Sequence, residues 1–168
     1  MVLTAIAVAS TTQQVSAVTS YKAVNQYSKK CMTVHGDNGV APESPNGTII
    51  DQWACGSTSN QRFEFRLKGY ASDGYPYYWL VSQSSPTKCV AISGGSNTIG
   101  AGAVLWTCSD TFNFYFKKYN HPALNGDSYL TAMHSGQMLH PKFSSKNDGY
   151  QLVQGYALGE ADYRWRFE

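Results

Sequence analysis

The sequence is poor in charged residues, which make up 14% of its 168 positions. The formal net charge is only +2, and the Lys and Arg residues are scattered along the chain. A nucleic-acid-binding face or a polybasic membrane patch requires a concentrated positive field. We therefore expect no nucleic-acid partner and no membrane insertion.

Helical periodicity and long apolar runs are also missing, and the run from Val2 to Ala9 is too short to span a bilayer as a helix. Gly, Ser, Thr, Asn and Tyr are plentiful instead, which favours a turn-rich all-β protein with a polar, uncharged surface. The length suits one domain with one core. This profile is typical of a secreted, extracellular protein.

Recognisable catalytic and metal-binding motifs are absent. The chain has no CxxC pair and no Cys/His cluster, and no nucleophile stands in a motif with a base. The histidines have no metal-ligand spacing and are expected to be ordinary; they are His35, His121, His134 and His140. Four acidic residues form no recognisable acid/base pair; they are Asp37, Glu43, Asp51 and Glu64. We expect no metal, no cofactor and no enzymatic activity.

The N-terminal segment, residues 1–18, allows two interpretations. No Lys or Arg precedes its apolar run, so it is an incomplete signal peptide. Its β-branched and small residues also suit an added strand that docks the protein on a larger assembly or on another subunit. Both alternatives remain open, with the domain itself predicted over residues 19–168.

Three copies of one unit organise the rest of the chain. Residues 49–65 form two short strands around a turn, with Trp53 two positions before Cys55 and an aromatic residue, Phe63, eight positions after it. The same pattern recurs over residues 103–116 with Trp106, Cys108 and Phe116, and a cysteine-free echo over residues 153–167 leads to Trp165. Repeats of roughly 45 to 50 residues cannot bury a face alone, so they must close around a shared axis.

The repeats also select one disulfide pattern. Four cysteines allow three pairings, and the repeat pattern favours one bridge within each of the first two repeats, Cys31–Cys55 and Cys89–Cys108. Bridges indicate an oxidising compartment. The third repeat begins near Asp127, and there we align Leu130 with the first Cys of the other repeats.

These residues resemble the ricin B-type lectin family, whose repeats end in a Gln-x-Trp signature. The likeness covers about Thr19 to Glu168 and rests on Cys31-Met32-Thr33-Val34, Cys89-Val90-Ala91-Ile92, the two Trp-x-Cys pairs and Gln61-Arg62-Phe63, where Phe replaces the signature Trp. It implies a β-trefoil: three repeats of four strands with pseudo-threefold symmetry, six strands forming a barrel and six forming a hairpin cap. The signature aromatics Phe63, Phe116 and Trp165 would then be core residues.

The resemblance also implies where sugars would bind. In repeat one it points to Asp51 and Asn60 as hydrogen-bonding groups, Trp53 as the ring that covers a sugar's C–H face, and Gln61 beside them. Thr33 stands at the position of the family's Asp, and Asp37 in the next turn is the candidate to replace it.

The other repeats keep less of this pattern. Repeat two has Trp106 and Asn113, but Ala91 and Val104 replace two polar positions. In repeat three, Ala132 is aligned with the Asp position and Gly155 offers no ring, so we expect a silent site.

Two functions compete. The first is a secreted carbohydrate-binding module that works alone or targets a toxin, hydrolase or adhesive assembly to glycans. The second is a trefoil with decayed sugar sites that serves as a structural or protein-interaction subunit. Trp53 and Trp106 fit both, as sugar-covering rings or as half-buried rings packed over the disulfides. An enzyme or protease inhibitor on the same fold has no supporting motif.

Overall fold

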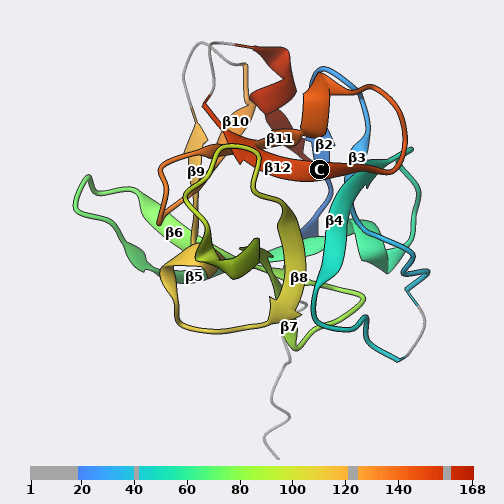
Figure 1. Cartoon of the computed structure of the whole chain (residues 1–168), viewed down its shortest axis with the longest axis horizontal. Helices are drawn as coiled ribbons and strands as arrows, with labels where there is room; N and C mark the ends of the chain where they lie inside the picture. Colours follow the sequence, from blue (N-terminus) through green and yellow to red (C-terminus); the bar gives the residue numbers. More distant parts are fainter. Residues whose placement is uncertain (1–18, 40–41, 121–124, 157–159) are drawn as a thin grey trace, which may run out of the picture.

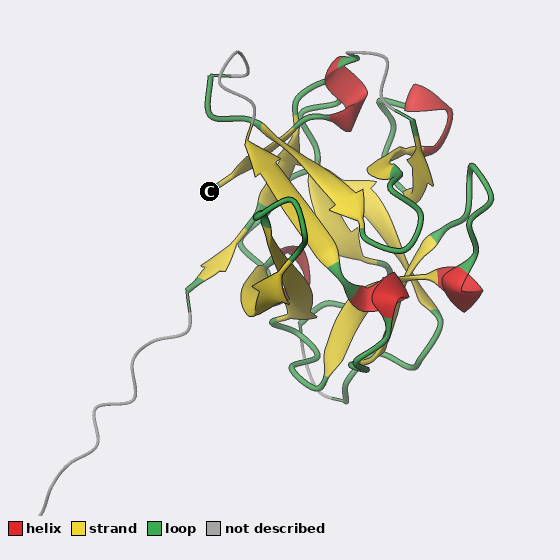
Figure 2. Ribbon diagram, turned by 90° about the vertical axis from the view of Figure 1, so that its left-hand side faces the viewer, coloured by secondary structure: helices red, strands yellow, loops and turns green. Residues whose placement is uncertain are grey.

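The computed structural model describes residues 19–39, 42–120, 125–156 and 160–168, which form thirteen strands of one continuous sheet system. The expectation for residues 1–18 concerns a segment outside the described residues. Between the strands lie single turns of 3-10 helix (Figure 2). Within the described ranges, no helix is long and apolar enough to cross a membrane.

The strands fall into three sets of four, preceded by the short strand β1 (Ser20–Tyr21). Repeat one consists of β2 (Ala23–Asn25), β3 (Cys31–Val34), β4 (Thr48–Trp53) and β5 (Phe63–Tyr70). Repeat two consists of β6 (Pro76–Ser82), β7 (Lys88–Ile92), β8 (Ala103–Thr107) and β9 (Phe116–Asn120). Repeat three consists of β10 (Ser128–Ala132), β11 (Met138–Pro141), β12 (Tyr150–Gly155) and β13 (Trp165–Phe167).

The pairing of these strands makes a β-trefoil. The fourth strand of each repeat pairs with the first strand of the next, as β5–β6, β9–β10 and β13–β2. The pairs β6–β9 and β10–β13 join these strands into the wall of a barrel. The second and third strands form the hairpins β3–β4, β7–β8 and β11–β12, and β4 also pairs with β8 and β12 (Figure 1). The all-β trefoil that the family resemblance implied is confirmed. The strand beyond the expected twelve is β1, which pairs with β5.

The core follows from the two-residue period of the strands. Met32, Val34 and Ile50 alternate with outward residues on β3 and β4 and lie in the central hydrophobic cluster. The equivalent inward residues of repeats two and three join them; they include Val90, Ile92, Leu105, Leu139 and Leu152.

The signature aromatics complete this core. Phe63, Phe116 and Trp165 begin the fourth strand of each repeat, and each side chain is at most 1% exposed. Burial of one such ring is worth roughly 2 to 3 kcal/mol. Trp165 also donates its ring N–H to the carbonyl of Leu139, 3.0 Å away, so its one polar atom is satisfied. Their predicted core role is confirmed.

Both predicted disulfides are present. Cys31–Cys55 joins the start of β3 to the segment after β4, and Cys89–Cys108 does the same for β7 and β8. The described residues contain no free cysteine. Each bridge therefore ties together one hairpin of the cap.

The alignment of the third repeat requires a correction. Leu130 lies on β10, the first strand of its repeat, whereas the cysteines Cys31 and Cys89 lie at the start of the second strand, as its first and second residue respectively. Met138 opens β11 and lies opposite Gly155, as Cys31 lies opposite Trp53 and Cys89 opposite Trp106. The position equivalent to Thr33 is therefore His140 and not Ala132. Ala132 is a buried core residue.

Candidate functional site

The outward face of the β3–β4 hairpin carries most of the residues predicted for a site. Because side chains alternate across a strand, residues two apart lie on one face. Cys31 lies opposite Trp53 and Thr33 lies opposite Asp51, so these four share the face away from the core. His35 follows two positions after Thr33 and reaches the same face. The hairpin thus presents an acid, a ring and an imidazole together.

This face forms the wall of a hollow of about 380 Å³. Its lining contains all six residues predicted for repeat one, namely Thr33, Asp37, Asp51, Trp53, Asn60 and Gln61, together with His35. The predicted residues are therefore brought together in space by the hairpin and by the turn before β5.

Asp51 is the buried acid of the hollow, with an exposed fraction of 0%. His35 Nδ1 lies 2.6 Å from its Oδ2, and the remaining oxygen, Oδ1, has no hydrogen-bond partner among the described residues. Burial raises the pKa of Asp51 above its ordinary value, and the hydrogen bond and charge of His35 act in the opposite direction. Asp51 therefore has one oxygen held by the protein and one that is left to accept a hydrogen bond.

Asn60 supplies a second buried acceptor. It lies in the 3-10 turn Ser59–Gln61 and donates its side-chain N–H to the carbonyl of Val34, 3.3 Å away. This bond fixes the amide, and Oδ1 is buried with no partner within the described part of the chain. An unpaired buried oxygen costs roughly 1 to 3 kcal/mol, which a ligand hydroxyl can recover.

Gln61 has a supporting role in the same turn. Its side-chain N–H groups donate to Thr33 Oγ1 at 3.1 Å and to the carbonyl of Ala54 at 3.0 Å, and its Oε1 accepts from the N–H of Gly56 at 2.7 Å. Thr33 in turn donates to the carbonyl of Cys31. Both residues line the hollow, but these internal bonds already engage their polar atoms. They hold the wall in place.

Trp53 forms the aromatic side of the hollow and is 46% exposed. The ring lies against the backbone of Gly149, where an added Cβ would come within 3.3 Å of it. It is thus supported from behind by repeat three while about half of its surface faces solvent. A ring in this position can stack on the C–H face of a sugar.

Asp37 lines the hollow, but both of its carboxylate oxygens are already bonded. Oδ1 accepts from the N–H of Gly39 at 2.6 Å, and Oδ2 accepts from Ser44 Oγ at 2.7 Å. These contacts fold the turn after β3. A ligand would therefore have to share a carboxylate that already has partners.

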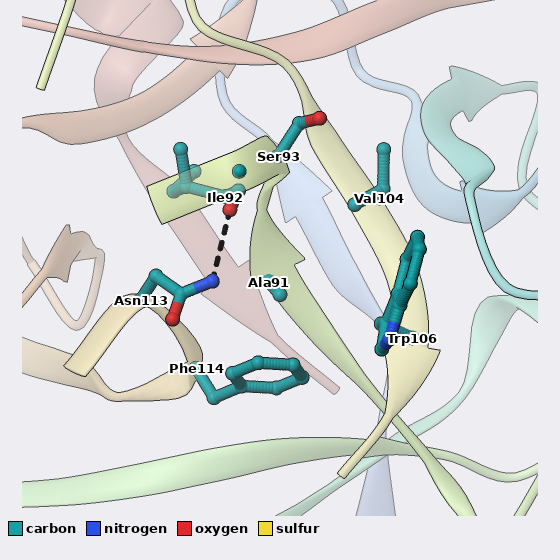
Figure 3. Close-up of a pocket in the computed structure, with 8 residues that line it drawn as sticks. Ala91, Ile92, Ser93, Val104, Trp106, Asn113 and Phe114 are labelled. Atoms are coloured by element: carbon teal, nitrogen blue, oxygen red, sulfur yellow. Dashed lines mark hydrogen bonds between the residues drawn. The ribbon is translucent and has the colours of Figure 1, made fainter. Parts of the chain in front are cut away.

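The hollow of repeat two is smaller and apolar. It measures about 190 Å³, with Trp106 on one side and Asn113 and Phe114 on the other (Figure 3). Ala91 and Val104 stand where repeat one has Thr33 and Asp51. Asn113 donates to the carbonyl of Ile92, as Asn60 does to Val34, but its Oδ1 also accepts from Thr111 Oγ1. No polar side-chain atom of this lining is both buried and unpaired in the described structure.

The site position of repeat three is filled by its own side chains. The rings of His140 and Tyr163 stack with centroids 4.2 Å apart, and His140 Nδ1 lies 3.5 Å from Asp162 Oδ2. A Cβ at Gly155 would lie 2.9 Å from both His140 Nε2 and the Tyr163 hydroxyl. The stack therefore occupies the space beside the position where the other repeats carry Trp. The prediction that this repeat lacks a ring at the Trp position holds, but a stacked pair fills the site.

Two groups were missed from the sequence. His35 was expected to be an ordinary histidine, yet it holds Asp51; its place two residues after Thr33, directly after β3, was the available signal. Asp162 stands three residues before the signature aromatic Trp165. Asn60 and Asn113 have the same spacing to Phe63 and Phe116, so this spacing identifies Asp162 as their equivalent in repeat three. Among the described residues, no group of three His, Cys, Asp or Glu side chains is arranged to hold a metal ion.

Comparisons with known proteins agree with this architecture. A family model described as ricin-type beta-trefoil lectin domain-like matches residues 10–106. No curated protein matches the chain in sequence.

Several solved structures share the fold. The designed threefold-symmetric protein ThreeFoil is 24% identical with a TM-score of 0.76, over 88% of this chain and 96% of that one. A ricin B-like lectin from Macrolepiota procera, in complex with lactose, is 16% identical with a TM-score of 0.68, over 93% and 99%. An exo-β-1,3-galactanase from Clostridium thermocellum is 20% identical with a TM-score of 0.77, over 90% of this chain but only 30% of the galactanase. At these identities the likeness shows the fold.

Proposed function

The chain belongs to the ricin-type β-trefoil lectin domain-like family, and on that premise we propose that it is a secreted carbohydrate-binding module whose competent site lies in repeat one. One observation carries the proposal. The side chains of Asp51 and Asn60, each with a buried oxygen that has no partner in the described structure, line one hollow together with the half-exposed ring of Trp53. Sugars combine hydroxyl donors with an apolar C–H face, which matches this set of groups.

The role of each residue in this site follows from its contacts. Asp51 Oδ1 and Asn60 Oδ1 would accept ligand hydroxyls, Trp53 would cover the apolar face of the ring, and His35 would hold Asp51 in position. Gln61, Thr33 and Asp37 would position the wall through the bonds that they already make. A sugar that cannot donate to both oxygens would leave a buried acceptor unpaired, which penalises the wrong epimer.

Two carboxylates line the hollow, and both are already bonded to the protein, Asp51 to His35 and Asp37 to Gly39 and Ser44, so we propose binding without catalysis. Binding by one shallow site should be weak, and useful avidity would come from several copies in one assembly. In the galactanase, a similar unit covers 30% of a longer chain. A role as the glycan-targeting part of a larger toxin, hydrolase or adhesive assembly fits this kind of arrangement.

A glycan array with the wild-type protein and two matched variants tests the proposal. Trp53→Ala should lower binding by at least tenfold, because a stacked ring contributes roughly 1.5 to 3 kcal/mol. Trp106→Ala removes an equally exposed ring from repeat two and should leave binding unchanged. Intact binding after Trp53→Ala, with loss after Trp106→Ala, contradicts the assignment to repeat one.

A second candidate is a structural or protein-interaction trefoil whose sugar sites have decayed. The filled site of repeat three and the apolar hollow of repeat two favour it. The same array separates the two functions, since silence on every glycan at several protein concentrations supports the second and excludes the first. Both candidates leave the role of residues 1–18 to mass spectrometry of the native chain.

A further inference from the structure

Each repeat places an equivalent side chain at the mouth of the barrel, and in repeat two this side chain differs in chemistry from the other two. Phe63, Phe116 and Trp165 are the equivalent core residues at the start of β5, β9 and β13. Two residues further along, the same inward face carries Phe65 on β5, Phe167 on β13 and Lys118 on β9. A lysine thus stands where the other two repeats have phenylalanine.

The strand register confirms that Lys118 points inward. It lies opposite Leu130, in the same way that Phe65 lies opposite Leu80 and Phe167 opposite Ala23. Directly opposed residues of an antiparallel pair share a face, and Leu130, Leu80 and Ala23 are all buried in the core. The Lys118 side chain therefore runs along the inner wall and brings its ammonium group to the barrel mouth.

The surroundings of this ammonium group are aromatic. Lys118 Nζ lies 4.6 Å from the ring centroid of Phe167 and 5.8 Å from that of Phe65. No carboxylate of the described residues lies within 4.0 Å of it, whereas the neighbouring Lys117 is paired with Asp73 at 2.6 Å. Burial lowers the pKa of Lys118, and no opposing charge in the described part of the chain restores it. The fold thus holds a partly desolvated cation that has no counter-ion among the residues the structure describes.

A hollow lies beside this cation. It measures about 260 Å³ and is lined by Thr19, Tyr21, Phe65, Tyr78 and Lys118. Tyr21 and Tyr78 each contact the ring of Phe65 edge to face, with centroids 6.0 and 5.7 Å apart. The hollow therefore combines three aromatic rings with a single positive charge, and its size suits a ligand of one ring rather than a drug-sized molecule.

We propose that this hollow, which we call the barrel-mouth site, binds a small carboxylate carried on an apolar ring. The carboxylate would pair with the Lys118 ammonium group, and the apolar ring would pack against Tyr21, Phe65 and Tyr78. None of these residues lines the sugar hollow of repeat one. The two sites are thus independent, and either proposal can fail without the other.

Titration of the full chain with sodium phenylacetate, followed by NMR of the lysine ε-methylene groups, tests the proposal. Phenylacetate should bind in the millimolar range and raise the pKa of Lys118 towards that of an exposed lysine, because the anion favours the charged ammonium. Phenylacetamide has the same shape without the charge. It should bind at least roughly tenfold more weakly, because a charge-assisted hydrogen bond is lost. Glycan binding should not change when phenylacetate is present.

Two variants complete the test. Lys118→Met keeps the apolar stem and removes the charge, so it should lose at least tenfold in phenylacetate affinity, whereas Lys117→Met on the outer face should bind as the wild type does. Equal binding of acid and amide, or an unchanged pKa of Lys118 with phenylacetate, overturns the proposal even if Lys118→Met fails to fold. A pKa of Lys118 that varies with protein concentration in the absence of phenylacetate also overturns the proposal. A second copy of the chain would then occupy the barrel-mouth site.

Discussion

His35 and Asp51 form a hydrogen-bonded pair at the wall of the repeat-one hollow, with Nδ1 and Oδ2 2.6 Å apart. The imidazole side chain is 51% exposed and the carboxylate is fully buried. His35 therefore holds one oxygen of a buried carboxyl group from the solvent side, and the other oxygen has no hydrogen-bond partner among the described residues. This arrangement determines how the site should respond to substitution and to pH.

Asp51→Asn should weaken sugar binding by about tenfold to a hundredfold. The amide can still accept the His35 hydrogen bond, but it then presents an N–H group where the ligand met a carboxylate oxygen, and a charge-assisted hydrogen bond is worth roughly 1.5 to 3 kcal/mol. Calorimetry with the sugar identified on the array measures the effect. Asp148→Asn changes an exposed neighbouring acid and serves as the control. Undiminished binding by Asp51→Asn contradicts the role of this oxygen.

The same variant should show a pH-dependent gain in stability. The folded-state pKa of Asp51 is raised by burial, so its ionisation destabilises the fold. The unfolding free energy of the wild type should therefore fall, relative to that of Asp51→Asn, as the pH rises from the pKa of an exposed aspartate through the raised folded value. Urea unfolding of both proteins at several pH values measures this difference. A difference that is constant across that window argues against a raised pKa.

His35→Ala should lower both stability and sugar binding. It leaves both oxygens of a buried carboxylate without a protein partner, at a cost of about 1 to 3 kcal/mol. His35→Gln retains a side-chain N–H that can reach Asp51 and should recover much of the loss. Urea unfolding and calorimetry report the two effects. If His35→Ala and His35→Gln behave alike, the hydrogen bond to Asp51 is not the reason for the loss.

His140 should make the fold sensitive to mild acid. Its pKa is lowered by burial, which Asp162 only partly opposes, so protonation favours the unfolded chain. The unfolding free energy should fall as the pH drops through the pKa of an exposed histidine towards the lowered folded value. His140→Phe keeps a ring against Tyr163 and should flatten this slope. Equal slopes for the two proteins in urea titrations would show that His140 is not responsible.

Removal of either disulfide should cost about 3 kcal/mol of unfolding free energy, because the bridges close loops of 24 and 19 residues that are otherwise unrestrained in the unfolded chain. Cys89→Ala with Cys108→Ala and Cys31→Ala with Cys55→Ala should therefore be similarly destabilised in urea. Only the repeat-one pair should also weaken sugar binding, because Cys31 lies opposite Trp53. Loss of binding in both double variants would point to general unfolding.

Much of the fold was predictable from local sequence. The two-residue period of the strands, the Trp-x-Cys pairs and the spacing to Phe63, Phe116 and Trp165 are all set within one repeat. They led to the three repeats and both bridges, and through the family resemblance that they carry to the trefoil and the core aromatics. The third repeat was misaligned because its hairpin has no cysteine to mark the register, and β10 and β11 are both short apolar strands. Only the pairing of Met138 with Gly155 fixed His140 as the equivalent of Thr33.

The sequence by itself determined which residues meet in repeat one, because the alternation of β3 and β4 and the spacing to Asn60 bring them to one face. Tertiary structure alone decided what those residues are able to do. Asn60 and Asn113 occupy equivalent positions, and each donates a side-chain N–H to a backbone carbonyl. Thr111 donates to the side-chain oxygen of Asn113, whereas nothing in the described structure donates to that of Asn60. A buried oxygen can accept a ligand hydroxyl only if no neighbouring donor already occupies it, and the positions of neighbouring donors are set by the tertiary structure.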